Sequence, residues 1–151
     1  MLRKFMLSTL TGVALTLSTT AYAQSTGTAA EAKAMVEKAV AELKTNEAAA
    51  LAKFNKADGG FRDRDLYVYC FEKLTGKFTA HVNPALMGTD VRALKEKDGA
   101  PLGQKVFDAA KEGTITTISY NFPKPGGTDP VAKEAFVTAV GNQGCGVGYY
   151  K

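Results

Sequence analysis

The sequence predicts an α+β fold, in which helices pack against a largely antiparallel sheet. A long segment with helical periodicity comes first, five short segments rich in strand-forming residues follow it, and three of the later connections are short enough for hairpins. The chain of 151 residues is 45% hydrophobic and 23% charged. This composition is typical of one globular domain and argues against a disordered or fibrous protein.

The N-terminus has the features of a secretory signal peptide. Two basic residues precede an apolar stretch over 5–17, and a motif of small residues ends at Ala23. This order predicts cleavage after Ala23. We therefore expect residues 1–23 to be a signal peptide, residues 24–151 to form one domain, and the mature protein to be periplasmic. An uncleaved anchor is the less favoured alternative, because the apolar run is short for a membrane span.

The charge of the chain argues against a nucleic-acid partner. The formal net charge is +4, and removal of the signal peptide takes away two bases, so that 17 bases and 15 acids leave +2. Acids and bases are interspersed in the mature chain and form no basic patch. We expect no nucleic-acid binding, and no membrane insertion after cleavage.

The segment from Thr28 to Asn55 predicts one long amphipathic helix. Thr28 and Glu31 have the spacing of a capping box, and apolar residues recur along the segment at steps of three and four. At 1.5 Å per residue this helix would be roughly 40 Å long, which is more than the core of so small a domain needs. We expect it to lie along the whole domain or to project from it. Its alanine-rich face is a candidate seam for a homodimer.

Five segments are predicted as strands, namely 65–72, 77–82, 114–122, 131–140 and 145–150. The first strand is apolar on both faces, which predicts a central position in the sheet. Two short helical segments, 84–95 and 101–112, are expected in the crossover between the second and third strands, with a cap at Asp90.

No motif in the sequence predicts catalysis, a cofactor or a metal site. The chain has a single histidine, His81, and no cysteine–histidine set with zinc spacing. Gly144, Gly146 and Gly148 have the spacing of a phosphate loop, but no helix follows them, as a dinucleotide fold requires. We interpret these glycines as small residues in a terminal strand that packs under the long helix. We predict that the protein is not an enzyme and binds no cofactor.

Several polar residues interrupt the otherwise apolar strands: Tyr67, Tyr69, His81, Tyr120 and Lys133. Taken singly, a strand lysine is more often solvated, a strand tyrosine more often packs in the core, and a lone histidine more often has a structural hydrogen bond. Taken together they are hydrogen-bond donors with no acid among them. An ammonium with several donors around an apolar pocket is the environment that a small carboxylate requires, since the charge binds it and the apolar wall accepts a short tail.

Cys70 and Cys145 both remain after cleavage at the predicted site. In an exported protein such a pair can form a disulfide, which would close a loop of 75 residues (145 − 70). Two separate buried thiols are the alternative, because the sequence does not give the distance between them.

From Tyr67 to Tyr150 the chain resembles the single Cache domains of the type-2 subfamily, which are PAS-like extracellular sensor modules of bacterial chemoreceptors and sensor kinases. The long helix before the first strand also fits. The residues that carry the resemblance are 65–69 (DLYVY), 80–88 (AHVNPALMG), 94–99 (LKEKDG), 120–126 (YNFPKPG) with Lys133 downstream, and 146–150 (GVGYY).

The resemblance implies a five-stranded antiparallel PAS-like sheet, with the first strand between the second and the fifth. That order places Cys70 beside the strand of Cys145 and favours the disulfide. It also implies a pocket on one sheet face, roofed by the crossover segments, for a small organic acid such as acetate, propionate, pyruvate or lactate. The ligand-binding candidates that it implies are Tyr67, Tyr69, His81, Asn83, Tyr120 and Lys133.

Members of this family are commonly fused to a membrane helix and a signalling domain, whereas this sequence ends at Lys151. We therefore expect a free-standing periplasmic module that binds its ligand reversibly, without catalysis, and acts through a membrane-bound signalling partner. The alternative is a periplasmic interaction or structural subunit that docks through the long helix and has a vestigial pocket.

Overall fold

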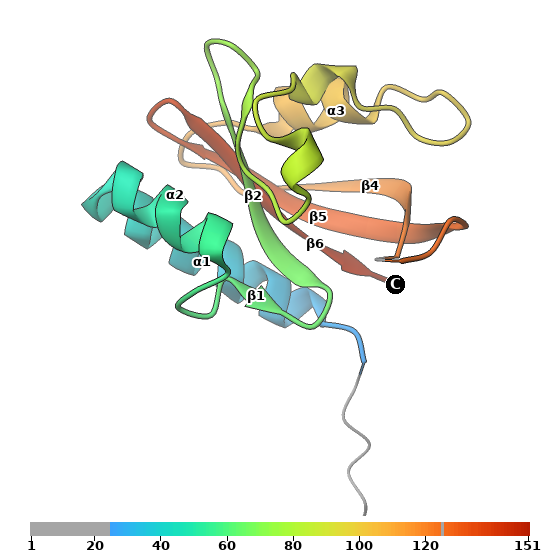
Figure 1. Cartoon of the computed structure of the whole chain (residues 1–151), viewed down its shortest axis with the longest axis horizontal. Helices are drawn as coiled ribbons and strands as arrows, with labels where there is room; N and C mark the ends of the chain where they lie inside the picture. Colours follow the sequence, from blue (N-terminus) through green and yellow to red (C-terminus); the bar gives the residue numbers. More distant parts are fainter. Residues whose placement is uncertain (1–24, 125) are drawn as a thin grey trace, which may run out of the picture.

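The computed structural model describes residues 25–124 and 126–151. The predicted signal peptide and its cleavage site lie outside the described residues. The domain has three layers (Figure 1): two N-terminal helices, an antiparallel sheet, and a layer of short helices on the opposite side of the sheet. The site is built between the second and third layers.

The predicted single helix is wrong, because the chain turns back at Asn46 and forms two helices, α1 (Ala29–Thr45) and α2 (Glu47–Lys56). Asn46 has an extended backbone (φ −161°, ψ 104°), and its N–H donates to the Glu42 carbonyl. Its side-chain oxygen accepts a hydrogen bond of 3.0 Å from the Ala49 N–H. One residue therefore ends α1 and caps α2.

The two helices lie antiparallel and form a hairpin that covers the sheet (Figure 1). An ion pair of 2.7 Å joins Lys53 Nζ of α2 to Glu42 Oε2 of α1. The capping box of Thr28 and Glu31 is present, as predicted. The helical layer therefore folds back over the domain instead of extending as one rod of 28 residues.

The sheet is antiparallel throughout, with the order β3–β2–β6–β5–β4 and a short β1 that pairs with the beginning of β2. Its strands are β1 (Arg62–Asp63), β2 (Leu66–Glu72), β3 (Phe78–Ala80), β4 (Thr116–Pro123), β5 (Pro130–Val140) and β6 (Gln143–Tyr150). The predicted position of the first long strand, between the second and the last, is confirmed. The short β1 was not predicted.

The crossover between β3 and β4 contains two 3₁₀ turns, η1 (Pro84–Leu86) and η2 (Val91–Ala93), and one helix, α3 (Leu102–Ala109). The helical turns predicted over 84–95 are present as these two 3₁₀ turns. They do not join into one helix, because Gly88 between them has a positive φ of 75°, which is incompatible with a right-handed helix. The predicted cap at Asp90 is present, since its carboxylate accepts from the Arg92 N–H at 2.9 Å.

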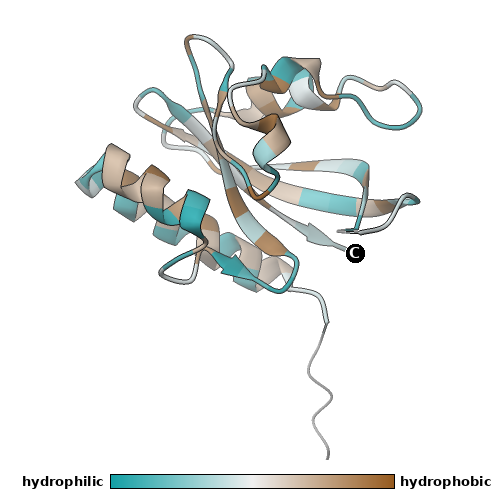
Figure 2. Cartoon of the chain, in the orientation of Figure 1, coloured by the Kyte–Doolittle hydropathy of each residue, from teal (hydrophilic) through white to brown (hydrophobic). Residues whose placement is uncertain are grey.

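Each face of the sheet carries its own core, and Figure 2 shows apolar segments on β2 and on the helices at both sides. The interpretation of the three β6 glycines is wrong, because they lie on the crossover face and not under α1. A Cβ on Gly148 would lie 2.6 Å from Lys133 Cε. Side chains of β2 and β5 lean over β6 in this way along the whole glycine row, so no larger residue fits there.

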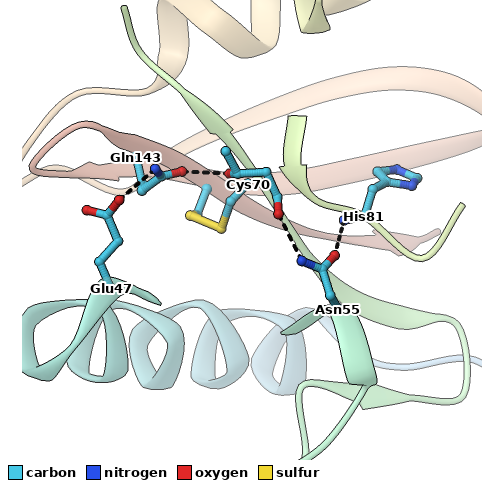
Figure 3. The surroundings of a disulfide bond; sticks show 7 residues. Glu47, Asn55, Cys70, His81 and Gln143 are labelled. Atoms are coloured by element: carbon cyan, nitrogen blue, oxygen red, sulfur yellow. Dashed lines mark hydrogen bonds between the residues drawn. A yellow bond between two sulfur atoms is a disulfide. The ribbon is translucent and has the colours of Figure 1, made fainter. Parts of the chain in front are cut away.

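Cys70 of β2 and Cys145 of β6 are register partners and form a disulfide, as the resemblance implied (Figure 3). Their Cα atoms are 4.1 Å apart. The bond lies on the hairpin side of the sheet, within the core that α1 and α2 cover. It links the two central strands behind the site.

We expect the double variant Cys70→Ala/Cys145→Ala to lose about 4 kcal/mol of unfolding free energy, because the bond closes a loop with a sequence separation of 75. Urea denaturation followed by circular dichroism measures the loss. Thiol titration of the unreduced, denatured wild type should find no free thiol. Two titratable thiols, or a variant as stable as the wild type, would contradict the prediction.

Candidate functional site

Two adjoining chambers lie between the sheet and the crossover layer. The inner cavity has a volume of about 40 Å³ and is lined by Tyr67, Tyr69, Phe78, His81, Val91, Leu94, Leu102, Val106, Tyr120 and Phe122. The outer chamber has a volume of about 430 Å³ and shares Tyr67, His81 and Phe122 with the inner one. These three side chains therefore border both chambers.

Lys133 is buried on the same face of the sheet, inside a cage of aromatic rings. The register places it between Tyr120 of β4 and Tyr150 of β6. Its side chain is 2% exposed, and Nζ lies 4.4 Å from the ring centroid of Tyr150, 5.0 Å from that of Tyr67 and 5.8 Å from that of Phe122. The faces of these rings stabilise the ammonium by cation–π attraction.

The ammonium of Lys133 has no hydrogen bond and no ion pair with any group of residues 25–124 and 126–151. It lies against Tyr67 and Phe122, which line both chambers, and not directly on either chamber wall. Burial lowers the pKa of Lys133 to about 8, while the negative charge of Asp65 acts in the opposite direction.

His81 follows β3 and presents its ring to both chambers. Its ring centroid lies 5.3 Å from that of Tyr67 and 5.3 Å from that of Phe78. Burial, together with the positive charge of Lys133, lowers the pKa of His81 to about 4, so the ring is neutral at neutral pH. Because Nδ1 accepts a hydrogen bond of 2.9 Å from the Asn83 N–H, the ring proton is assigned to Nε2, which is then a donor.

The two tyrosines of the inner cavity, Tyr69 and Tyr120, supply hydroxyl groups. Tyr69 is 8% exposed, and its hydroxyl has no hydrogen-bond partner among the described residues. A buried polar group left without a partner costs about 1–3 kcal/mol, so such a group points to a partner from outside the chain. Burial raises the pKa of Tyr120 well above its ordinary value, which keeps this hydroxyl protonated.

Asn83 differs from the other candidates, because its side chain already has a structural role. Its Oδ1 accepts a hydrogen bond of 3.0 Å from the Ala85 N–H and so caps η1. It lines the outer chamber and not the inner one. The structure therefore gathers five of the six candidates around the inner cavity and its aromatic wall, and places Asn83 at the edge of the outer chamber.

The sequence interpretation missed Tyr150, Phe122 and Asp65. Tyr150 completes the cage of Lys133, and its hydroxyl donates to the Pro123 carbonyl at 2.6 Å. An acid does accompany the donors in the structure, since Asp65 is 8% exposed and lines the outer chamber. Alternation along the last strand could have identified Tyr150, because it pairs with Lys133 once the strand order is known.

The family follows from a comparison of the whole sequence. The sequence model of the family Single Cache domain 2 matches residues 7–149. The chain belongs to this family. Among curated proteins, the methyl-accepting chemotaxis protein McpP of Pseudomonas putida is 30% identical over 76 residues. That alignment covers 50% of this chain and only 14% of the relative, so this Cache domain corresponds to a small part of that receptor.

Solved structures share the fold. A methyl-accepting chemotaxis protein of Vibrio parahaemolyticus has a TM-score of 0.64 at 21% identity, covering 80% of this chain and 86% of that one. A periplasmic sensor domain of a chemotaxis protein has a TM-score of 0.59 at 27% identity (79% and 87%). A Cache chemosensory domain, described for its carboxylic acid recognition, has a TM-score of 0.59 at 21% identity (79% and 85%). The predicted α+β, PAS-like Cache fold is confirmed.

Membership in this family makes the domain a sensor module, of a kind that lies outside the cytoplasm and is generally non-catalytic. Within the described part of the chain, no helix has the length and apolar character that a bilayer crossing needs. Within the same residues, no three histidine, cysteine or acidic side chains are grouped as metal ligands would be.

We expect Lys133→Met to be more stable than the wild type below pH 8. The pKa of Lys133 is about 8 in the folded protein against an ordinary 10.5, so the unfolded chain binds more protons between these values and wild-type stability rises with pH there. This pKa shift means that burying the charged Lys133 costs the folded wild type about 3 kcal/mol of stability. The variant regains this amount but loses the cation–π contacts, which are worth about 1 kcal/mol. Urea denaturation at pH 7 should show Lys133→Met about 2 kcal/mol more stable than the wild type. The stability of the variant should not rise between pH 7 and pH 9.5, whereas that of the wild type should.

The control for this prediction is Lys95→Met, which removes an exposed lysine and should change neither the stability at pH 7 nor its rise with pH. A Lys133→Met variant that is less stable than the wild type at pH 7 would contradict the account of the cage.

Proposed function

We propose that this Cache domain is a periplasmic sensor module that reversibly binds a small organic acid of the acetate, propionate, pyruvate and lactate class, without catalysis. The observation that carries the proposal is the buried ammonium of Lys133, which has no anionic partner among the described residues. Charged groups are seldom buried in this way unless they are paired. A ligand carboxylate supplies the missing partner.

The neighbouring donors support a carboxylate over other anions. The hydroxyls of Tyr69 and Tyr120 and the Nε2–H of His81 lie around the inner cavity, and all three are neutral donors at neutral pH. The rest of the wall is aliphatic or aromatic, which suits a short alkyl tail. A water needs about 10–15 Å³ by this measure, so the cavity of about 40 Å³ accepts only a few heavy atoms.

The relatives support a role in signalling. Three of them are named as chemotaxis proteins. We infer that a membrane-bound signalling protein responds to the ligand-bound domain, and that export through cleavage of residues 1–23 brings the domain to the periplasm. Mass spectrometry of the exported protein, with an N-terminus at Gln24, tests the cleavage.

Short carboxylates should raise the melting temperature of the purified domain. A ligand at 100 times its dissociation constant adds about 2.7 kcal/mol, which is several degrees for a domain of this size. A thermal-shift panel of acetate, propionate, pyruvate and lactate, with sodium chloride at equal ionic strength as the control, measures this. Lys133→Met should lose the shift, and Lys95→Met should keep it. If no acid of the panel shifts the wild type, the proposed function is wrong.

Tyr69→Phe separates a binding role from a structural one. Because the Tyr69 hydroxyl has no partner among the described residues, its removal should leave the unliganded stability unchanged or raise it by about 1 kcal/mol, while the affinity for the acid falls about fivefold to tenfold. The matched control is Tyr149→Phe on the hairpin side, where the hydroxyl donates to Glu134. That variant should lose stability and keep its affinity. A reversed pattern would assign Tyr69 to packing alone.

A further inference from the structure

The crossover layer that roofs the inner cavity is attached differently at its two sides. On the side of β3 the attachment is made by backbone hydrogen bonds. The Phe78 N–H donates to the Thr89 carbonyl at 2.9 Å, and the Val91 N–H donates to the Gly76 carbonyl at 2.8 Å. α3 packs directly on η2, because a Cβ on Gly103 would collide with the Val91 carbonyl oxygen. The layer is therefore held firmly on the side of β3.

The opposite side of the layer meets β4, which ends the sheet. Among the described residues, two hydrogen bonds join segment 84–112 to β4, and each uses a side chain of the layer. Lys105 Nζ of α3 donates to the Ser119 carbonyl at 2.9 Å, and the Glu96 carboxylate accepts from the Asn121 N–H at 2.8 Å. Both bonds are exposed, so water can replace either partner at a small net cost. The seam between the layer and β4 thus has the weaker polar attachment.

This seam lies beside the inner cavity. Ser119 and Asn121 flank Tyr120 along β4, and Tyr120 lines the cavity. In α3, Lys105 is followed by Val106, which lines the cavity from the roof. A surface hollow of about 330 Å³ is bordered by Tyr120 and by all four residues of the two bonds. Tyr120 therefore borders both the inner cavity and a hollow that lies at the seam.

We propose that the ligand enters and leaves the inner cavity through this seam, and that the bonds of Lys105 and Glu96 form a latch that keeps it closed. The inference rests on the proposed function for its ligand and adds the route of exchange and the residues that control its rate. Opening the seam breaks two exposed hydrogen bonds and leaves the backbone bonds at β3 intact. Because the latch is closed in both the empty and the occupied domain, weakening it speeds entry and exit alike.

The outer chamber offers the competing route, since Tyr67, His81 and Phe122 border both chambers. That wall has more contacts to lose. The rings of Tyr67 and Phe122 contact the Lys133 ammonium, and the His81 ring accepts from the Asn83 N–H. The three rings of the ammonium cage all belong to the sheet, so the seam can open without disturbing them.

The double variant Lys105→Met/Glu96→Met tests the latch, because methionine keeps an unbranched side chain and removes the donor and the acceptor. We expect the association and dissociation rates both to rise about tenfold, and about threefold in either single variant, while the dissociation constant stays within about twofold. Acetate, propionate, pyruvate and lactate all carry a methyl group, whose NMR exchange gives the dissociation rate, and isothermal titration calorimetry gives the dissociation constant. Lys95→Met, which removes an exposed lysine from the same layer, should change neither quantity.

The outcomes separate the latch from the proposed function. If the variants exchange ligand at the wild-type rate, or if their affinity falls while the association rate is unchanged, the latch inference is wrong and the proposed function stands. Leu86→Ala widens the outer chamber and not the inner cavity, so faster exchange in that variant alone would assign the route to the outer chamber. If none of the four acids binds the wild type, the proposed function fails together with the inference. The single variants decide the question if the double variant does not fold.

Discussion

Lys133 is almost wholly buried, and much of the surrounding structure compensates for that position. Three rings contact it, and they come from β2, β4 and β6, so the cage exists only with this strand order and this register. It also requires glycine at position 148. A Cβ there would lie 2.6 Å from Lys133 Cε and 2.9 Å from the Tyr120 hydroxyl. The site therefore requires the glycines on this face of β6.

The position of His81 is determined from the other side of the sheet. A chain of hydrogen bonds begins at Glu47 and continues through the buried Gln143 (both labelled in Figure 3) to Thr79, with distances of 2.9 and 2.7 Å. Asn55 then joins the Thr79 carbonyl to the His81 N–H. Because Glu47 and Asn55 both belong to α2, the helical hairpin fixes the end of β3 from which the His81 ring extends. A movement of that ring is thereby connected to α2.

The sequence could predict the strand order and the burial of Lys133, because apolar neighbours surround that residue and the family resemblance supplies the topology. It could not predict the turn at Asn46. Asparagine occurs both on helix surfaces and at caps, and contacts distant in sequence, such as Lys53 with Glu42, accompany the turn. The face of the β6 glycines depends on the register with β2 and β5, which alternation alone does not give. Asp65 was missed because an acid at the beginning of a strand is usually solvated.

Buried polar groups without partners among the described residues destabilise the unliganded domain. The Lys133 ammonium, the Asp65 Oδ2 and the Tyr69 hydroxyl have no partner within residues 25–124 and 126–151, and each makes the unliganded domain less stable than a satisfied core would be. Under the proposed function, a ligand that matches these groups recovers this free energy. Tyr150 is the ring nearest to Nζ, and its hydroxyl is bonded to Pro123 at the end of β4. Under the proposed function, a ligand beside Lys133 therefore contacts the part of the sheet where Tyr150 joins the last residues of β6 to the end of β4.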